Sequence, residues 1–504
     1  MMMATTQQSP QFLSDLLIGL ASITADDDVE IYGISQYSGD TKQGDVFLAT
    51  ANGASHGLSY QEDAIARGAA AIVWETAAVI DVECLNSSVP TIEVAALSEH
   101  VLELVNRFYG CSSQDLYVNA VTGTDGKSSV SHLLAQALNS LGEDCGLIGT
   151  LGYGRLSQLN LATHTTPPPA RLAREFSQLV AEGCQQVAIE ASSHALAQGR
   201  LQGLKINVAI LTNISQDHFD YHQTEEDYIA AKAKLFFDGN AEYAVINRDD
   251  AVAQRWSRSW QQKAKLVQYS MTQTEADVYA SAIQYSADGV DLNLHLAADS
   301  LTIHSKLLGP FNVSNLLAVA ATLFVQGFHG EQIKSALEKL LPVPGRMQVV
   351  PSEKRHVVVD FAHTANALTA AIAAVRVHYS GRLICVFGCG GERDKAKRPV
   401  MGELAARYAD EIIITSDNPR SEDPALIATE ILMGAQKTAT EQKNIRVILD
   451  RELAIAEAIN RSTAADVILI AGKGHETEQQ IGEQKFPFDD VLVATDLLNR
   501  RGDV

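Results

Sequence analysis

The stretch LYVNAVTGTDGKSSV, residues 116–130, decides the fold of the middle of this 504-residue chain. It begins as a run of strand-forming residues, breaks at its glycines, and continues into apolar positions at helical spacing, among them Val130, Leu134 and Leu141. In a glycine turn between a strand and a helix, backbone amides cradle phosphates, a lysine meets the outer ones and a hydroxyl holds Mg²⁺. The stretch therefore predicts a phosphate-binding loop in an α/β domain with a mostly parallel sheet.

Lys127 and Ser128 fit the lysine and hydroxyl roles in this loop. The usual eight-residue pattern has a glycine at 121, where this chain has Val121, so the match is to a shorter form, Gly-Thr-x-Gly-Lys-Ser. Asp125 is expected to be tolerated rather than required, because a carboxylate beside a triphosphate is repelled. The predicted ATP-binding residues of the loop are Gly123, Thr124, Asp125, Gly126, Lys127, Ser128 and Ser129.

Length and composition are typical of a globular enzyme with several domains: the chain is 46% hydrophobic and 20% charged. It has no run of about 18 apolar residues, so we expect no membrane span. Its first basic residue is Lys42, so we expect no signal peptide. We expect the protein to be cytoplasmic and monomeric. The net charge of −22 argues against a nucleic-acid partner but not against small anionic ligands. The six cysteines, expected as reduced thiols, are Cys84, Cys111, Cys145, Cys184, Cys385 and Cys389.

The pattern along the chain predicts three α/β domains. Short strand-like runs at 44–50 and 69–75 and a helical pattern at 98–109 indicate a small domain over residues 1–113. The phosphate loop belongs to a larger domain, 114–344, which ends at LLPVPGRMQ (340–348), expected to be a hinge. From 345 to 504 strands and helices alternate, which predicts a doubly wound, Rossmann-like domain that binds ligands beyond the carboxyl ends of its strands.

Polar residues follow further strands of the central domain. Glu190 ends one strand-like run, and a carboxylate at a strand end in a nucleotide-binding domain is a good Mg²⁺ ligand. His218 follows the next run, and a helix offers Lys232 and Lys234. Taken singly, His218 could be a capped turn histidine and Lys232 a solvated lysine. Beside a phosphate loop, both become candidates for the chemistry.

A series of motifs in a fixed order makes the chain resemble the Mur ligases, which form amide bonds with ATP in peptidoglycan synthesis. The resemblance covers essentially the whole chain. Its motifs are TGTDGKSS, HTTPPP, EASSH, NISQDHFDYH, AAKAKLF, GPFNVSNLLAV, PGRMQ, VVVDFAHT, GCGGERDKAKRP, SDNPR and AGKGHE. The last three resemble the branch that adds meso-2,6-diaminopimelate to the D-glutamate of UDP-N-acetylmuramoyl-L-alanyl-D-glutamate.

The resemblance implies that the substrate carboxylate attacks the γ-phosphate of ATP and that an amine then displaces phosphate from the acyl phosphate. It implies that the first domain binds UDP-muramyl groups, the central domain ATP and the last domain the amino acid. The implied catalytic residues are Lys127, Glu190, His218 and Lys232; the implied magnesium ligands are Ser128, Glu190, His218 and Lys232, the last as a carbamate. The implied nucleotide-facing residues from the hinge side are Asn315, Arg346, Asp360 and His363. The residues implied to bind the muramyl dipeptide are Ser38, His164, Thr165, Thr166, Ser192, Gln198 and Arg200.

The chain departs from the family pattern at three places. YSG (37–39) stands where Asp-Ser-Arg is usual in the uridine motif, so only Ser38 is carried over. DFAHTAN (360–366) has Phe, Ala and Asn where Tyr, Pro and Asp are common, and His164 stands where Asn is frequent. None of these changes removes a group from the chemistry.

SDNPR (416–420) suits a substrate with an ammonium–carboxylate centre at its far end, as meso-diaminopimelate has. A planar guanidinium binds a carboxylate through two parallel hydrogen bonds, so Arg420 is expected to bind this carboxylate and Glu476 the ammonium. The alternatives are that Arg420 is solvated or pairs with Glu422 or Asp423. The predicted diaminopimelate-binding residues are Arg393, Asp417, Asn418, Pro419, Arg420, Gly472 and Glu476.

Other functions stay open at this point. A lysine-adding ligase, or another relative such as a folylpolyglutamate synthase, would keep the phosphate loop and bind a different amino acid. A non-catalytic UDP-muramyl-binding protein would be expected to lack Lys127, Glu190, His218 or Lys232, and all are present. A dinucleotide oxidoreductase is disfavoured because GCGGERD (388–394) is not a Gly-x-Gly-x-x-Gly loop.

Overall fold

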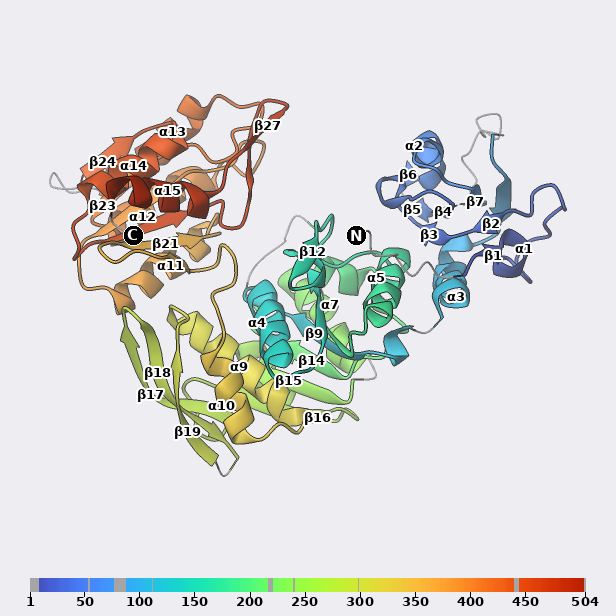
Figure 1. Cartoon of the computed structure of the whole chain (residues 1–504), viewed down its shortest axis with the longest axis horizontal. Helices are drawn as coiled ribbons and strands as arrows, with labels where there is room; N and C mark the ends of the chain where they lie inside the picture. The colour runs from blue at the N-terminus through green and yellow to red at the C-terminus, as the bar shows by residue number, and fades with distance from the viewer. Residues whose placement is uncertain are drawn as a thin grey trace. The chain divides into compact units, whose positions relative to one another are not determined.

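A computed structural model describes residues 9–52, 55–76, 88–110, 112–215, 221–238, 241–297, 299–438 and 444–502. Contacts along the chain divide it into two compact units, residues 1–267 and 268–504. Figure 1 shows the helices and strands of the chain. Among the described residues, no helix combines the length and the apolar character that crossing a membrane requires. The division into three domains at 113 and 344 stays a prediction.

The first unit begins with a four-stranded parallel sheet in the order β3-β4-β7-β8. The apolar face of α3 packs on it, since Leu97, Val101 and Leu104 share a core with Val46 and Val73. The strands and the helix expected here are β4, β7 and α3. The elements are β1 (Gln11–Phe12), α1 (Leu13–Leu16), β2 (Glu30–Ile31), β3 (Gly33–Ser35), β4 (Asp45–Ala49), β5 (Ala51–Asn52), β6 (Ser55–His56), α2 (Gln61–Ala66), β7 (Ala71–Glu75), β8 (Thr91–Val94) and α3 (Leu97–Tyr109).

A second sheet in this unit places the phosphate loop. Strand β9 lies between β13 and β14 in the order β12-β11-β10-β13-β9-β14-β15, and β10, β13, β9, β14 and β15 run parallel. Because the carboxyl ends of parallel strands meet at one edge of a sheet, the loops after β9, β13 and β14 lie together. The elements are β9 (Tyr117–Thr122), α4 (Lys127–Ser140), β10 (Cys145–Gly149), β11 (Gly152–Arg155), β12 (Gln158–Asn160), α5 (Pro169–Ala181), β13 (Gln186–Glu190), α6 (Ser193–Ala197), β14 (Val208–Leu211), α7 (Glu225–Phe237), β15 (Tyr243–Asn247), α8 (Ala251–Arg258) and β16 (Lys265–Ser270), in which the boundary between the units falls.

The second unit contains an antiparallel meander, β17-β18-β19, which the sequence pattern did not lead us to expect. A six-stranded sheet follows in the order β20-β21-β25-β22-β23-β24, parallel from β21 onward. The elements are β17 (Val278–Ser286), β18 (Gly289–Leu296), β19 (Asp299–Ser305), α9 (Pro310–Val325), α10 (Gly330–Glu338), β20 (Gln348–Val350), β21 (His356–Asp360), α11 (Ala365–His378), β22 (Leu383–Phe387), α12 (Lys397–Tyr408), β23 (Glu411–Ile414), α13 (Pro424–Thr438), β24 (Asn444–Val447), α14 (Arg451–Arg461), β25 (Val467–Ala471), β26 (Glu478–Ile481), β27 (Gln484–Pro487) and α15 (Asp490–Arg501).

The doubly wound architecture predicted for the last part of the chain is confirmed. In β25, Leu469 and Ala471 point into one core while Ile468 and Ile470 point into another, so the strand is apolar throughout. Since β25 lies beside β22 and β22 lies beside β23, the loops after these three strands are neighbours at one edge of the sheet. Arg393, Arg420 and Glu476 come from these loops.

The second half of the expected hinge is fixed to the last sheet. Gly345 has φ +65°, and a Cβ there would lie 2.0 Å from the backbone nitrogen of His475, so only glycine fits. Met347 is fully buried, and its backbone N–H donates to Asp360 Oδ2 at 2.8 Å. The Arg346 guanidinium lies over the Phe361 ring, 4.5 Å from its centroid. Residues 345–347 therefore belong to the packing of the last sheet, and a hinge in the preceding residues stays a prediction.

A buried ion pair joins the carboxyl ends of β23 and β25. Arg451 and Asp490 are both fully buried and make two hydrogen bonds of 2.7 Å. The same guanidinium donates to the carbonyl oxygens of Ser416 at 3.3 Å and Ala471 at 3.1 Å. These carbonyls immediately precede Asp417 and Gly472, so Arg451 fixes the first residues of the loops after β23 and β25.

Replacing Arg451 by Met is expected to lower the free energy of unfolding by about 3–5 kcal/mol, because Asp490 is left buried without its partner. Urea denaturation would measure the change. Arg407→Met is the matched control: its pair with Glu403 is solvent-exposed and is expected to contribute about 0.5 kcal/mol or less. Equal effects of the two substitutions would contradict this account.

Candidate active site

The phosphate loop brings two lysines to one carbonyl oxygen. Lys127 Nζ donates to Gly123 O and Thr124 O at 2.9 Å each. Lys232, fully buried on α7, donates to the same Gly123 O at 2.7 Å. The two ammonium groups are therefore roughly 6 Å apart at most, a separation at which their repulsion favours a bound anion. A bound anion, or the loss of one of the two charges, would relieve this repulsion.

The end of β14 supports the outer part of the phosphate loop. Thr212 Oγ1 donates to Asp125 O at 2.6 Å, and Asp125 N donates to Asn213 Oδ1 at 3.0 Å. The hydroxyls of Thr124 and Tyr228 lie 2.9 Å apart. Asp125 is held through its backbone while its side chain is exposed, an arrangement in which the carboxylate can point away from phosphate.

The Glu190 carboxylate, at the end of β13, is the buried anion of the site. Ser128 Oγ donates to Glu190 Oε2 at 2.8 Å, and the backbone N–H of Thr150 donates to Oε1 at 2.7 Å. Thr150 Oγ1 lies 3.3 Å from Oε2. A Cβ on Gly149 would lie 2.2 Å from Oε1, so glycine is required for this close approach.

Ser128 and Glu190 fit a magnesium ion. They place a hydroxyl and a carboxylate oxygen side by side, and oxygen ligands of this kind suit Mg²⁺. Among the residues that the structure describes, no group of three or more His, Cys, Asp or Glu gathers as a metal site. His218, the predicted ligand of a second ion, lies outside the described residues.

The residues predicted to bind the muramyl dipeptide surround the same carboxylate. Thr165 Oγ1 lies 3.1 Å from Thr150 Oγ1, and Thr166 Oγ1 donates to the Glu190 backbone carbonyl at 2.6 Å. Ser192 N donates to Thr166 Oγ1 at 3.0 Å, and Arg200 Nη1 donates to Thr166 O at 2.7 Å. The structure therefore brings these residues together next to the phosphate loop.

The remaining members of this set lie at its margin. Gln198 accepts from Arg200 Nε at 2.9 Å. The rings of His164 and Tyr37 lie 5.2 Å apart, so two of the chain's departures from the family pattern pack on each other, and Ser38 is the next residue. The uridine contacts stay a prediction.

The predicted nucleotide-facing residues of the second unit have local roles there. Asn315 Nδ2 donates to Asn312 Oδ1 at 2.9 Å, and Asp360 Oδ1 accepts from Ala362 N at 2.8 Å. Burial raises the pKa of Asp360, although the Arg346 charge opposes the rise. His363 contacts the Phe361 carbonyl at 3.0 Å. Their approach to ATP stays a prediction.

Arg420 does not pair with Glu422. Glu422 instead accepts from the fully buried Arg398 at 2.9 and 3.1 Å, and these bonds, with one from the Glu392 backbone, lower the pKa of Glu422 to about 2. Arg420 Nη1 donates to Gly391 O at 2.7 Å, and its Nη2 and Nε make no hydrogen bond within the described residues. The guanidinium keeps an edge for a ligand.

Arg420 also has an unusual backbone. Its φ is +51°, and it bridges to β26 through Arg420 N to Gln480 O at 3.2 Å and Gly482 N to Arg420 O at 2.7 Å. A non-glycine residue with positive φ is uncommon and costs free energy, which the bridge to the β26–β27 hairpin offsets. The position of the Arg420 side chain is therefore fixed both by its backbone bonds to the hairpin and by its side-chain bond to Gly391 O.

Glu476 and Asn418 join the loops after β25 and β23. Asn418 Nδ2 donates to Glu476 Oε2 at 2.8 Å, and the fully buried Lys473 donates to the same oxygen at 2.9 Å. Burial raises the pKa of Asp417, whereas Glu476 keeps a pKa below its usual range because Lys473 and Asn418 outweigh its burial. Gly472 lies beside Asp417, while Arg393 is exposed.

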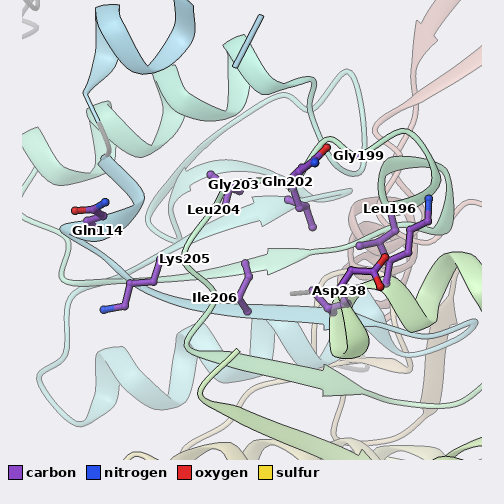
Figure 2. Close-up of a pocket in the computed structure, with 12 residues that line it drawn as sticks. Gln114, Leu196, Gly199, Gln202, Gly203, Leu204, Lys205, Ile206 and Asp238 are labelled. Carbon is purple, nitrogen blue, oxygen red and sulfur yellow. The ribbon is translucent and has the colours of Figure 1, made fainter. Parts of the chain in front are cut away.

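A separate cavity of about 690 Å³ lies along residues 199–206 and α7 (Figure 2). It contains none of the predicted site residues. Its walls include Leu196, Ile206 and Leu235, with Lys234 and Asp238. It lacks the residues of the phosphate loop and the Glu190 cluster, which stay the candidates for the chemistry.

Sequence reasoning missed Thr150 and Lys473. Thr150 follows β10, and a polar residue between glycines at a strand end was the available signal. Lys473 lies inside the AGKGHE motif between the two residues that were selected. In both cases the role depends on contacts across the sheet, which spacing along the chain does not show.

Comparisons with known proteins agree with this geometry. The sequence matches the Mur ligase middle domain over residues 121–323 and the Mur ligase, glutamate ligase domain over residues 345–474. UDP-N-acetylmuramoyl-L-alanyl-D-glutamate--2,6-diaminopimelate ligases are similar to the chain: that of Ectopseudomonas mendocina is 42% identical over 94% of this chain and 96% of its own, and that of Alkalilimnicola ehrlichii is 41% identical over 95% and 97%. A solved ligase of the same name is 33% identical with a TM-score of 0.69, covering 98% of this chain and 100% of that one. The chain belongs to the Mur ligase family.

Proposed function

We propose that the chain is an ATP-dependent ligase that joins meso-2,6-diaminopimelate to the D-glutamate of UDP-N-acetylmuramoyl-L-alanyl-D-glutamate in peptidoglycan biosynthesis. The observation that carries this proposal is the contact between Thr150 and Thr165, 3.1 Å between hydroxyl oxygens. Thr150 also binds Glu190, which binds Ser128 of the phosphate loop. One chain of contacts thus links the predicted phosphate loop to the residues expected to hold the muramyl dipeptide. The names of the similar ligases supply the substrates.

The first step requires two anions, the substrate carboxylate and the γ-phosphate, to meet. Lys127, now bound to its own loop, would turn to the γ-phosphate and stabilise the charge that develops there. Thr165 and Thr166 would orient the D-glutamate carboxylate for attack on the γ-phosphorus, which forms an acyl phosphate as the bond to the β-phosphate oxygen breaks and ADP leaves. The amine of diaminopimelate then attacks the acyl carbon, and phosphate leaves.

Ser128 and Glu190 would hold Mg²⁺, which when bound offsets the repulsion between the two anions. Thr150 would keep the Glu190 carboxylate oriented toward Ser128. We further propose that Lys232 is carbamylated. The conversion would replace one of the two neighbouring cations at Gly123 O by an anion, removing their repulsion and adding an oxygen ligand for a metal.

The last domain would bind the carboxylate and ammonium groups at the far end of the amino acid. Arg420 has free donors for the distant carboxylate, and Glu476 lies on the neighbouring loop for the distant ammonium. L-Lysine lacks that carboxylate and would leave Arg420 unpaired. This favours diaminopimelate over lysine by about ten- to a hundredfold.

Product formation from ATP, UDP-muramyl dipeptide and a panel of amino acids tests the proposal. We expect turnover with meso-diaminopimelate and little with L-lysine. Arg420→Ala should raise the KM for diaminopimelate about ten- to a hundredfold, and Arg420→Lys should restore little, because a point charge cannot make the two parallel bonds. The KM values for the other substrates should change little. Equal use of L-lysine by the unaltered enzyme would refute this assignment.

Thr150→Val removes a hydroxyl but keeps the backbone bond to Glu190 and nearly the same volume. We expect kcat to fall about tenfold, with more Mg²⁺ needed for half-maximal rate, because Glu190 and Thr165 lose their shared partner. A magnesium titration at saturating substrates measures both effects. Thr302→Val, at an exposed position on β19, is the control. An unchanged magnesium dependence would argue against the role of Thr150.

Lys232→Ala should nearly abolish turnover, and a short carboxylic acid in the buffer should restore part of it by filling the place of the carbamate. Carbon-13 NMR of enzyme equilibrated with labelled bicarbonate should show a carbamate signal that the variant lacks. Full activity of Lys232→Arg would show that only a positive charge is needed there.

A further inference from the structure

Lys473 is a fully buried lysine that the proposed reaction does not use. Its ammonium donates to Glu476 Oε2 at 2.9 Å, to Asn418 Oδ1 at 3.2 Å and to the carbonyl of Glu478 at 2.6 Å. Three acceptors satisfy its three donors, so it has no hydrogen left for a substrate. Its place between the loops after β23 and β25 indicates a role exerted through its neighbours.

We infer that Lys473 is a positioning residue that aims Glu476 at the far ammonium group of the incoming amino acid and thereby favours amino acids that carry such a group. The inference rests on the proposed function for the identity of that amino acid. It adds a residue to the site and assigns each oxygen of Glu476 a separate role.

The two oxygens of Glu476 differ in their contacts. Lys473 and Asn418 both donate to Oε2, while Oε1 makes no hydrogen bond within the described residues. The Glu476 side chain is 35% exposed, whereas Lys473 is 0% exposed. The carboxylate is therefore anchored by its inner oxygen and presents the outer one to a ligand.

Lys473 also fixes which way the Asn418 amide points. Asn418 Oδ1 accepts from Lys473 Nζ and, at 2.9 Å, from the backbone N–H of Gln480. Two donors at this atom identify it as the oxygen, so Nδ2 must face Glu476. Without the ammonium, the amide would lose one of the two contacts that orient it, and Glu476 would lose its charged anchor.

The ammonium also keeps Glu476 ionised. Burial would raise the pKa of Glu476, but Lys473, Asn418 and the nearby His475 lower it. Asp417 and Arg451, the other charged groups that interact with Glu476, oppose one another in sign. An ionised Glu476 is the form that binds an ammonium group, so removing Lys473 should make this binding more sensitive to acid.

The test is a set of steady-state measurements on the full chain with ATP, UDP-muramyl dipeptide and meso-diaminopimelate. Lys473→Met should raise the KM for diaminopimelate about ten- to a hundredfold and change kcat and the other two KM values little. Lys485→Met is the matched control, because that lysine also pairs with an acidic residue, Glu478, but is 62% exposed. The preference for diaminopimelate over 2-aminopimelate, which keeps the far carboxylate but lacks the far ammonium, should shrink in Lys473→Met and persist in the control.

The pH dependence separates positioning from a merely structural role. In the wild type, the pKa of Glu476 is depressed, so kcat/KM for diaminopimelate should fall only at low pH; in Lys473→Met the acid limb should move to higher pH. In the Glu476→Gln background, Lys473→Met should add little further loss, because both act on one carboxylate. If Lys473→Met does not fold, Lys473→Gln, which keeps a donor without the charge, undergoes the same measurements.

The outcomes are distinct. An unaltered enzyme that rejects diaminopimelate refutes the proposed function. An unaltered enzyme that accepts it, together with a folded Lys473 variant whose diaminopimelate KM and acid limb are unchanged, refutes only the role of Lys473. Additive losses in the double variant would also overturn that role.

Discussion

The constraint on which the catalytic half depends is the burial of the Glu190 carboxylate at the end of β13. A carboxylate with 1% exposure is costly unless hydrogen bonds or a metal compensate it. The surrounding sequence meets that need with the Thr150 backbone N–H, the Ser128 hydroxyl and a glycine at 149 that leaves room. The same residues join the phosphate loop to the threonines after β12. The hydrogen bonds that compensate the Glu190 charge therefore also hold the residues of the candidate site together.

In the last domain the buried charges are cations rather than an anion. The loops after its strands are held by buried cations: Arg451 binds the carbonyls that precede two loops, Lys473 joins Asn418 to Glu476, and Arg398 holds Glu422. Each cation donates to several acceptors, which helps to offset the cost of burying its charge. Loops rich in glycine and proline gain a defined geometry in this way without a large apolar contact.

Much of the fold and of the candidate site could be predicted from the sequence, because the patterns that indicate them are local. The phosphate loop, the strand ending at Glu190 and the alternating elements after 345 follow from residue types and spacing over a few turns. The roles of Thr150 and Lys473 could not be predicted in this way. Thr150 contacts Glu190, 40 residues away, and Lys473, although only three residues from Glu476, joins it to Asn418, 55 residues away. The positive φ of Arg420 and its bridge to β26 depend on a hairpin that the pattern did not reveal. The roles given to the site residues themselves still stand as predictions.

The close packing of Gly345 on the Gly474–His475 backbone has a mechanical consequence. Points near an axis of rotation travel least, so a swing about residues 341–344 would carry distant helices of the last domain through wide arcs and displace the Glu476 loop only slightly. Thermal motion of the domain about these residues would then displace its outer surface far more than the Glu476 loop. Binding of the amino acid at this loop would therefore not require the domain to be rigidly fixed.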